Sequence, residues 1–239
     1  MVADERGALI APLVLAIESA TAAPSVALVE GDRTLALASA QPGASAAATV
    51  LALVEAVLVD ASVRLSRVEL FAVAIGPGSF TGLRVGLATV KGLAFASAAP
   101  AADVSTLEAL ALAAGSQRSR VAALLDARRG DVYAAAFGPG ERELLAEGLY
   151  PAAVVAERLA TGCILTGDGA RLHRDLFAGA ACSPAEPCMS PAEAVARLGL
   201  RRLERGLARP AAELVPHYLR RAEAEARRLG IATESKNPF

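Results

Sequence analysis

The chain is poor in several kinds of residue, and each shortage weakens the case for one class of function. Its 239 residues include no tryptophan and two histidines, and 24 lysines and arginines nearly balance 25 aspartates and glutamates. The formal net charge of −1 gives no electrostatic footprint for holding a nucleic acid unaided, because phosphate binding needs clustered cations. Lysine is nearly absent while alanine and arginine are abundant, as codon bias would produce, so the mean hydropathy of +0.42 carries little weight.

Cysteine and long apolar runs are also scarce. Cys163, Cys182 and Cys188 form an odd set without CxxC spacing, which argues against a disulfide framework or a zinc site and favours a reducing cytosol. The apolar runs are broken by turn residues well before the length that spans a membrane. Residues 1–12 place acids before any apolar run and lack the charge pattern of a signal peptide. We therefore expect a cytoplasmic protein without membrane contact, with 1–12 as a disordered leader.

The first half of the chain has the pattern of a mixed α/β domain. Short apolar segments bounded by turn residues predict strands, and apolar residues at helical spacing predict helices. The expected elements are strands at 13–20, 25–30 and 34–40, a helix at 44–61, a strand at 70–75, a helix from about 82, and a strand at 99–104. Ser105 and Glu108 then match a capping box that opens another helix.

The second half repeats this order more weakly. It predicts strands at 121–126, 131–137 and 142–150, a helix at 152–159, a strand at 163–166 and helices near 191–207. An acid ends the first strand of each half, Glu18 and Asp126. We interpret the chain as two copies of one domain, 13–108 and 109–220, followed by a charged tail at 221–239. A single larger α/β domain is the alternative.

The stretch GPGSFTGLRVGLATVKGLA, Gly76–Ala94, carries the clearest candidate site. It joins an apolar strand to a helix through a glycine-rich turn, in which Ser79 or Thr81 would cap the helix. The backbone N–H groups of residues 78–82 would then point out of a helix N-terminus, where proteins hold phosphates or carboxylates. Alternatively, the glycines only permit a tight turn and a close approach of the helix to its sheet.

The helix after this turn carries two charges, Arg84 and Lys91, on one face. A helix so apolar around its circumference should be covered on most sides, by its own sheet and by a second subunit. A helix buried inside one domain, with two charges that reach the solvent, is the alternative.

The run GPGSFTGLRVG closely resembles the signature shared by the bacterial TsaB (YeaZ) proteins and their larger paralogue TsaD, which together make threonylcarbamoyladenosine in tRNA. Four further stretches fit the same family in order and spacing: LAIESAT (Leu15–Thr21), LLDARRGDVYAA (Leu124–Ala135), TGDG (Thr166–Gly169) and VPHYLR (Val215–Arg220). TsaD-type transfer depends on a metal held by a His-x-x-x-His pair, whereas His173 and His217 lie far apart here. The resemblance is therefore to the TsaB type.

The resemblance implies an α/β protein with two ribonuclease H-like lobes of the actin-like and sugar-kinase fold. It implies a non-catalytic partner of a TsaD-like catalytic subunit, working with a TsaE-like ATPase. That complex would use ATP and Mg²⁺ to form N6-threonylcarbamoyladenosine at position 37 of tRNAs reading codons that begin with A. The chain would bind no cofactor or metal by itself, would contact tRNA through the complex, and would form a homodimer when alone.

The residues at the expected cleft depart from those of kinases and ATPases of this fold, which place Asp-x-Gly-Thr after the first strand. Here Glu18-Ser19-Ala20-Thr21 has a longer acid and no glycine, and Asp126-Ala127-Arg128 also lacks the glycine. No serine, cysteine or lysine has the context of a nucleophile, so we expect no catalytic residue. The candidates for an anion or nucleotide turn are Glu18, Ser19, Thr21, Gly76, Gly78, Ser79, Thr81, Gly82, Asp126, Gly167, Asp168 and Gly169.

The helix at 44–61 and the signature helix are the expected partner interface. Its candidate residues are Leu51, Val54, Leu58, Phe80, Leu83, Arg84, Leu87 and Lys91. Two other functions stay open: an autonomous small-molecule kinase or ATPase of the same fold, and a protease acting on its paralogue, which no nucleophile and base pair supports.

Overall fold

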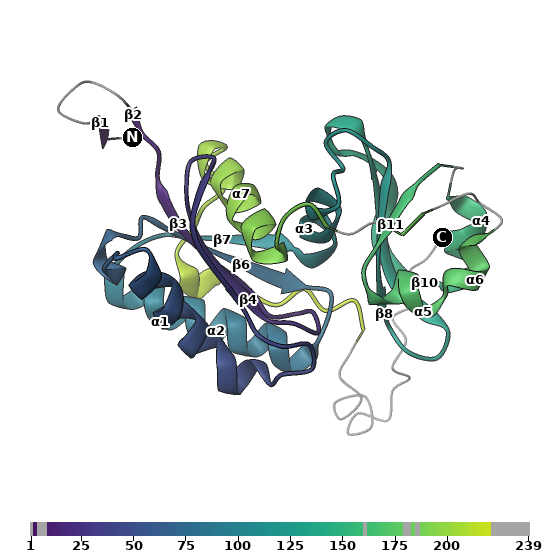
Figure 1. Cartoon of the computed structure of the whole chain (residues 1–239), viewed down its shortest axis with the longest axis horizontal. Helices are drawn as coiled ribbons and strands as arrows, with labels where there is room; N and C mark the ends of the chain where they lie inside the picture. Colours follow the sequence, from purple (N-terminus) through teal and green to yellow (C-terminus); the bar gives the residue numbers. More distant parts are fainter. Residues whose placement is uncertain (1, 4–8, 160–161, 179–182, 185–186, 221–239) are drawn as a thin grey trace.

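The computed structural model describes residues 2–3, 9–159, 162–178, 183–184 and 187–220 (Figure 1). The charged tail at 221–239 and Cys182 lie outside this part. Within the expected leader, β1 (Val2–Ala3) pairs antiparallel with β2 (Leu9–Ile10). In the part of the chain that is described, no helix has both the length and the apolar character needed to cross a membrane.

The first sheet has five strands in the order β5-β4-β3-β6-β7. They are β3 (Leu13–Glu18), β4 (Ser25–Glu30), β5 (Arg33–Ser39), β6 (Leu70–Gly76) and β7 (Ala101–Ser105). The first three form an antiparallel meander, while β6 and β7 run parallel to β3. Every residue of β3 is buried because helices cover both faces of the sheet.

The second sheet repeats this topology, in the order β10-β9-β8-β11-β12. Its strands are β8 (Val121–Asp126), β9 (Asp131–Gly138), β10 (Arg142–Pro151), β11 (Ile164–Thr166) and β12 (Ser183–Pro184). Again the first three are antiparallel, and β11 and β12 run parallel to β8. The predicted duplication and the fold class are confirmed.

The helices form layers around the two sheets (Figure 1). The helices α1 (Ala46–Asp60) and α2 (Phe80–Ser97) cover one face of the first sheet. On the outer face of the second sheet lie α4 (Ala152–Arg158), α5 (Asp168–Leu172) and α6 (Arg174–Phe177). Between the sheets, α3 (Thr106–Ala113) packs on both, with Leu112 toward the first and Leu110 toward the second.

The last helix, α7 (Pro191–Glu204), returns to the first sheet. Its Val195 and Leu198 pack against that sheet, and a methyl group at Gly199 would approach the Cβ of Ala72 to 2.6 Å. The predicted division into 13–108 and 109–220 therefore does not follow the packing: the chain leaves the first lobe after α3 and comes back with α7. Sequence order alone places α7 with the second half, because the contact is distant along the chain.

Three short 3-10 turns complete the described elements that bear on the site. They are η1 (Leu65–Arg67), η2 (Pro139–Glu141) and η4 (Ala211–Glu213). After η4, residues 214–220, which we call the strap, run to the cleft between the lobes, and Leu214 at its start is buried in the core beneath α2.

Candidate functional site

The acid at the end of β3, Glu18, forms its hydrogen bonds within the turn that follows the strand. Glu18 is fully buried, and its carboxylate accepts hydrogen bonds from Ala20 N (2.6 Å), from Thr21 N (3.0 Å) and from the Thr21 hydroxyl. Burial raises the pKa of the Glu18 carboxyl, and these three hydrogen bonds oppose that shift. The carboxylate thus closes its own turn and does not face the cleft.

The glycine-rich turn before α2 packs tightly on this same segment. Ser79 caps the helix, with its Oγ accepting from Gly82 N at 3.2 Å, as predicted. Ser79 N donates to Ala20 O at 2.8 Å, and Ser19 Oγ donates to Gly82 O at 2.8 Å. A methyl group at Gly82 would overlap the carbonyl oxygen of Ser19, so glycine is needed here for the contact between helix and strand.

The second lobe has an equivalent turn after β8. Asp126 Oδ1 accepts from Arg128 N at 2.8 Å, and Asp126 N donates to Asp168 Oδ1 at 3.0 Å. Gly167 has a φ of 94°, and a side chain there would overlap the carbonyl oxygen of Leu124. Asp126 and Asp168 therefore both accept hydrogen bonds from backbone groups of the second lobe, as Glu18 does in the first lobe.

A cleft of about 590 Å³ lies between the two turns. Five sequence-predicted residues line it together: Thr21, Gly78, Ser79, Asp126 and Asp168. The other candidates do not line this cleft: Glu18, Ser19, Gly76, Thr81, Gly82, Gly167 and Gly169.

Tyr133 and Arg220 also line the cleft and were not among the predicted site residues. Burial raises the pKa of the Tyr133 phenol, with Asp126 adding to the shift and Arg220 opposing it. Arg220 bonds Asp131 at 2.6 Å and also donates to Ala127 O. The stretch Val215–Arg220 was singled out by its resemblance to the family, but nothing in its sequence indicated that Arg220 would line the cleft.

The strap ties the lobes together at a second point. His217 N donates to Ile75 O at 2.8 Å in the first lobe, and His217 Nε2 lies 3.1 Å from Glu147 Oε1 in the second. Ser105 Oγ donates to the other oxygen of Glu147. The carboxylate thus stands between the hydroxyl and the imidazole, so His217 is not placed to take a proton from Ser105, which argues against a serine hydrolase.

Burial raises the pKa of the Glu147 carboxyl. The hydrogen bond from Ser105 and the charge of His217 oppose this shift, whereas the negative charges of Glu108 and Glu143 add to it.

The strap also contacts the start of the signature helix. The rings of Phe80 and Tyr218 stack with centroids 4.9 Å apart, and Arg84 Nε donates to the Tyr218 hydroxyl at 3.1 Å. The Arg84 guanidinium lies 3.9 Å from the centroid of the Phe80 ring. Two residues expected at a partner interface are therefore already engaged within the chain, although Arg84 stays exposed.

The predicted interface residues divide into two groups. Val54, Leu83 and Leu87 are 4%, 1% and 6% exposed, so including them in the interface was wrong: they pack in the core of the first lobe. Apolar residues at helical spacing mark the buried face of a helix as readily as a partner surface, which explains the error. Leu51 is 64% exposed and borders a groove of about 400 Å³ with the partly buried Leu58.

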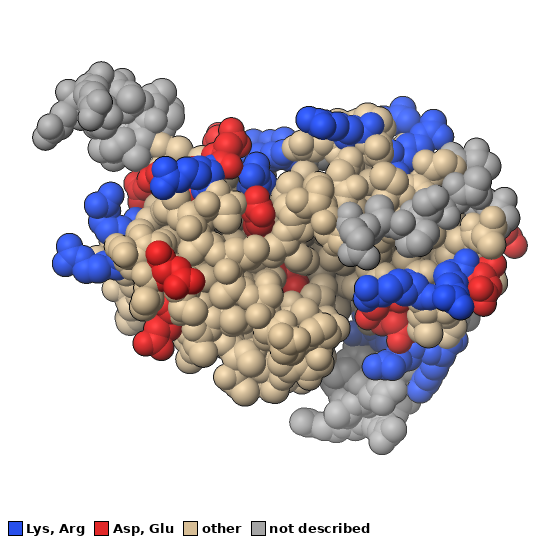
Figure 2. Space-filling view, viewed as in Figure 1, with Lys and Arg blue, Asp and Glu red and all other residues tan. Residues whose placement is uncertain are grey.

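The exposed side of α1 and α2 is largely apolar. Figure 2 shows a broad surface with few charged side chains over the lower part of the first lobe, where these helices lie in Figure 1. Val59 is 68% exposed and Phe95 is 91% exposed, although neither was among the predicted residues. We call the surface formed by Leu51, Val59, Ala88, Gly92 and Phe95 the α1–α2 face; all five residues are exposed.

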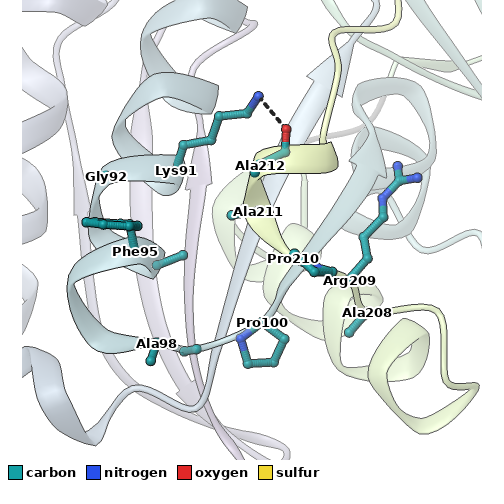
Figure 3. A pocket seen from close by; sticks show the side chains of 12 residues that line it. Lys91, Gly92, Phe95, Ala98, Pro100, Ala208, Arg209, Pro210, Ala211 and Ala212 are labelled. Carbon is teal, nitrogen blue, oxygen red and sulfur yellow. Dashed lines mark hydrogen bonds between the residues drawn. The ribbon is translucent and has the colours of Figure 1, made fainter.

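A pocket of about 990 Å³ continues this face at the end of α2 (Figure 3). It lies between that helix and residues 208–212, with the Phe95 ring on the helix side and Pro210 opposite. Lys91 spans the gap and its Nζ donates to Ala212 O at 3.1 Å. This lysine was predicted as a partner contact and instead bonds the chain itself.

Within the part of the chain that the structure describes, nothing requires glycine at position 92. Gly92 is exposed in the interior of α2, and a Cβ added to it would meet no described atom within 4 Å. A glycine in a helix interior costs about 1 kcal/mol relative to alanine, so α2 is less stable with Gly92 than it would be with alanine at this position.

Comparison with known proteins gives consistent matches. A family model described as TsaD, tRNA N6-adenosine threonylcarbamoyltransferase, matches residues 44–160. The tRNA threonylcarbamoyladenosine biosynthesis protein TsaB of Haemophilus influenzae is 37% identical over 50% of this chain, so the aligned region spans about half of that relative, 51%.

Solved structures match over a longer stretch. YeaZ from Pseudomonas aeruginosa is 31% identical with a TM-score of 0.70, and a second Pseudomonas aeruginosa structure, described as similar to peptidase YEAZ, is 30% identical with a TM-score of 0.74. Each match covers 87% of this chain and 100% of the other. A ROK hexokinase from Thermus thermophilus, 14% identical with a TM-score of 0.52, covers 80% of this chain and 99% of the hexokinase and shares the fold alone.

Proposed function

Because this chain belongs to the TsaB (YeaZ) family, we propose that it acts in the biosynthesis of threonylcarbamoyladenosine in tRNA as a partner subunit without catalytic residues of its own. It assembles in the cytoplasm with a TsaD-type threonylcarbamoyltransferase, and a TsaE-type ATPase serves the same complex. The product is N6-threonylcarbamoyladenosine at position 37 of tRNAs that read codons beginning with A. The uncovered α1–α2 face is the observation that carries the proposal.

The cleft supports a subunit without chemistry of its own. Phosphoryl transfer needs a carboxylate that is free to hold Mg²⁺ or to orient water. Glu18 is fully buried and accepts three hydrogen bonds, and Asp126 and Asp168 each accept one from a backbone N–H. Glu18, the acid after the first strand, is thus occupied by its own turn, and one oxygen each of Asp126 and Asp168 is held by a backbone N–H. In this proposal ATP and Mg²⁺ bind to other subunits.

The α1–α2 face has the properties of a helix-packing surface. Leu51 on α1 and Phe95 on α2 expose large apolar side chains, and the small residues Ala88 and Gly92 of α2 are exposed as well. A partner helix can approach closest where side chains are smallest, and this would explain a glycine that none of the described residues requires. Exposed apolar surface of this kind, interrupted on α1 by Glu55, is typical of a protein interface.

The same face serves a homodimer when the TsaD-type partner is absent. A two-fold dimer uses one surface twice, so it needs no second interface. Homodimer and heterodimer then exclude each other, and the partner's concentration sets their ratio.

Nucleoside mass spectrometry of tRNA from cells depleted of this protein tests the proposal. We expect threonylcarbamoyladenosine to fall, and expect the wild-type chain to restore it. Leu51→Glu, which places a charge on the exposed face, should fail to restore it, whereas Ala153→Glu on the exposed side of α4 should succeed. Unchanged threonylcarbamoyladenosine in depleted cells would overturn the proposal. Mg²⁺-dependent ATP turnover by the isolated chain would favour a small-molecule kinase or ATPase instead.

A further inference from the structure

Four arginines gather at the end of the second lobe that is remote from the cleft. Strands β8 and β10 run in the same direction, since each is antiparallel to β9, and they begin next to Arg120 and at Arg142. Arg118 lies in the loop just before β8. Helix α4 ends with Arg158, and the next described strand along the chain is β11. The backbone N–H of its first residue, Ile164, donates a hydrogen bond to Arg120 O at 2.8 Å. All four arginines therefore lie near the start of β8, whereas the cleft lies at its end.

The strand register places two of these arginines in one row. Val121 pairs with Phe137, so Arg120 comes opposite Gly138, and Arg142 pairs with Gly138 from the other side. Cross-strand neighbours point to the same face, and with strands about 4.8 Å apart the two arginine backbones are roughly 10 Å apart. Gly138 contributes no side chain between them, and a Cβ added to Gly138 would lie 3.5 Å from the side chain of Leu144.

This face of the sheet is also the one that α4 covers. Ala136, two residues before Gly138 on β9, packs in the same cluster as Val155 of α4. Arg158, one turn further along α4, therefore ends on the side of the sheet to which Arg120 and Arg142 point.

All four side chains are exposed, and within the described residues none forms a hydrogen bond or ion pair. Some other arginines of the chain are paired: Arg128 with Asp126, and Arg209 with Asp103. Figure 2 shows basic side chains along the upper edge of the second lobe, with no acidic side chain among them in this view. These guanidinium groups are thus available to an external anion.

We propose that this basic end, Arg118, Arg120, Arg142 and Arg158, binds phosphates of an RNA backbone. The inference rests on the proposed function, in which tRNA is the RNA that the complex modifies. Guanidinium groups bind phosphate through paired N–H donors. Glu143 and Glu157 neighbour Arg142 and Arg158 in the sequence, but in the described part of the chain none of the four arginines pairs with an acid. Leu144 lies beside Gly138, between two of these arginines, and offers no ring on which a base can stack, so we infer contacts to phosphates rather than to bases.

Fluorescence anisotropy of an end-labelled, unmodified tRNA transcript with the full chain tests this surface at 50 to 200 mM KCl. The test variant is Arg120→Gln, Arg142→Gln and Arg158→Gln together. The matched control is Arg33→Gln, Arg67→Gln and Arg171→Gln, three other exposed arginines without a hydrogen bond or ion pair in the described part of the chain. Both variants lose the same charge, so only the position of the arginines differs.

Each phosphate contact contributes about 0.7 to 0.9 to the slope of log affinity against log salt, so the test variant should lose about 2 to 3 from that slope. The advantage of wild type over the test variant should then shrink roughly 30-fold from 50 to 200 mM salt. An equal loss in both variants, no loss in either, or no binding by wild type at 50 mM would overturn the proposal. The assay measures binding and not modification. The RNA-binding proposal can therefore fail while the role in threonylcarbamoyladenosine synthesis stands, and that role can fail while RNA binding is observed.

Discussion

Replacing Gly92 by alanine should stabilise the isolated chain and weaken its complexes. The added Cβ meets no atom of residues 2–3, 9–159, 162–178, 183–184 or 187–220 within 4 Å, so we expect the change to act on the isolated chain through helix propensity. Alanine is favoured over glycine by about 1 kcal/mol in a helix interior, which corresponds to a rise in melting temperature of roughly 2 to 4 °C for a chain of this size.

In a complex the same methyl group occupies the place where a partner helix approaches. Overfilling a packed contact costs about 1 to 3 kcal/mol, which weakens the dissociation constant by about 5- to 150-fold. The stability of the chain and the affinity for its partner therefore change in opposite directions. A general loss of folding would lower both.

Thermal denaturation at low protein concentration, where self-association is least, measures the first effect, and isothermal titration calorimetry with the TsaD-type partner measures the second. Ala153→Leu on the exposed side of α4 serves as control, because it adds more volume outside the α1–α2 face and should leave affinity unchanged. An unchanged or tighter complex with Gly92→Ala would refute the close helix contact.

Three further outcomes are expected. Leu51→Glu should abolish the 1:1 complex and leave the melting temperature within a few degrees, whereas Leu83→Glu should unfold the chain because Leu83 is 1% exposed; gel filtration and circular dichroism separate the two. Arg220→Ala removes a partly buried bond to Asp131, so urea denaturation should show a loss of about 1 to 3 kcal/mol, and exchange of the His217 amide should speed up. Burial raises the pKa of Glu147 above its usual 4.5, so the folded chain binds more protons than the unfolded chain just above that pH; wild-type stability should therefore fall as pH rises through this range, and Glu147→Gln should flatten the decline in a pH series of denaturation curves.

Local patterns allowed much of the fold to be predicted. Strand β4 has the predicted bounds, Ser25–Glu30, because apolar residues end at a glycine turn, and Ser79 caps α2 because its hydroxyl lies next to the free N–H groups of the first turn. The repeated order of strands and helices confirms the duplicated fold, since element order depends on periods that each segment carries within itself.

What could not be predicted depends on contacts distant in sequence. The position of α7 on the first sheet follows from the fit of Gly199 to Ala72, which no spacing reveals. Likewise, Glu18 was predicted for the candidate site but hydrogen-bonds within its own turn, whereas Arg220 of the strap was not predicted and lines the cleft. Helical spacing could not separate Leu83, which is buried, from Leu51, which is exposed, because both are apolar residues on amphipathic helices.

The return of α7 to the first sheet affects the order in which the protein can form on the ribosome. The strands of the first sheet are complete at Ser105, but the helix that covers one face of it comes only with residues 191–204. The strands and helices of the second lobe are synthesised in between, so that lobe can fold while the first still exposes an apolar face. The lobe that begins the chain is therefore the later one to be finished, and until α7 emerges its open face is a surface for chaperones to protect.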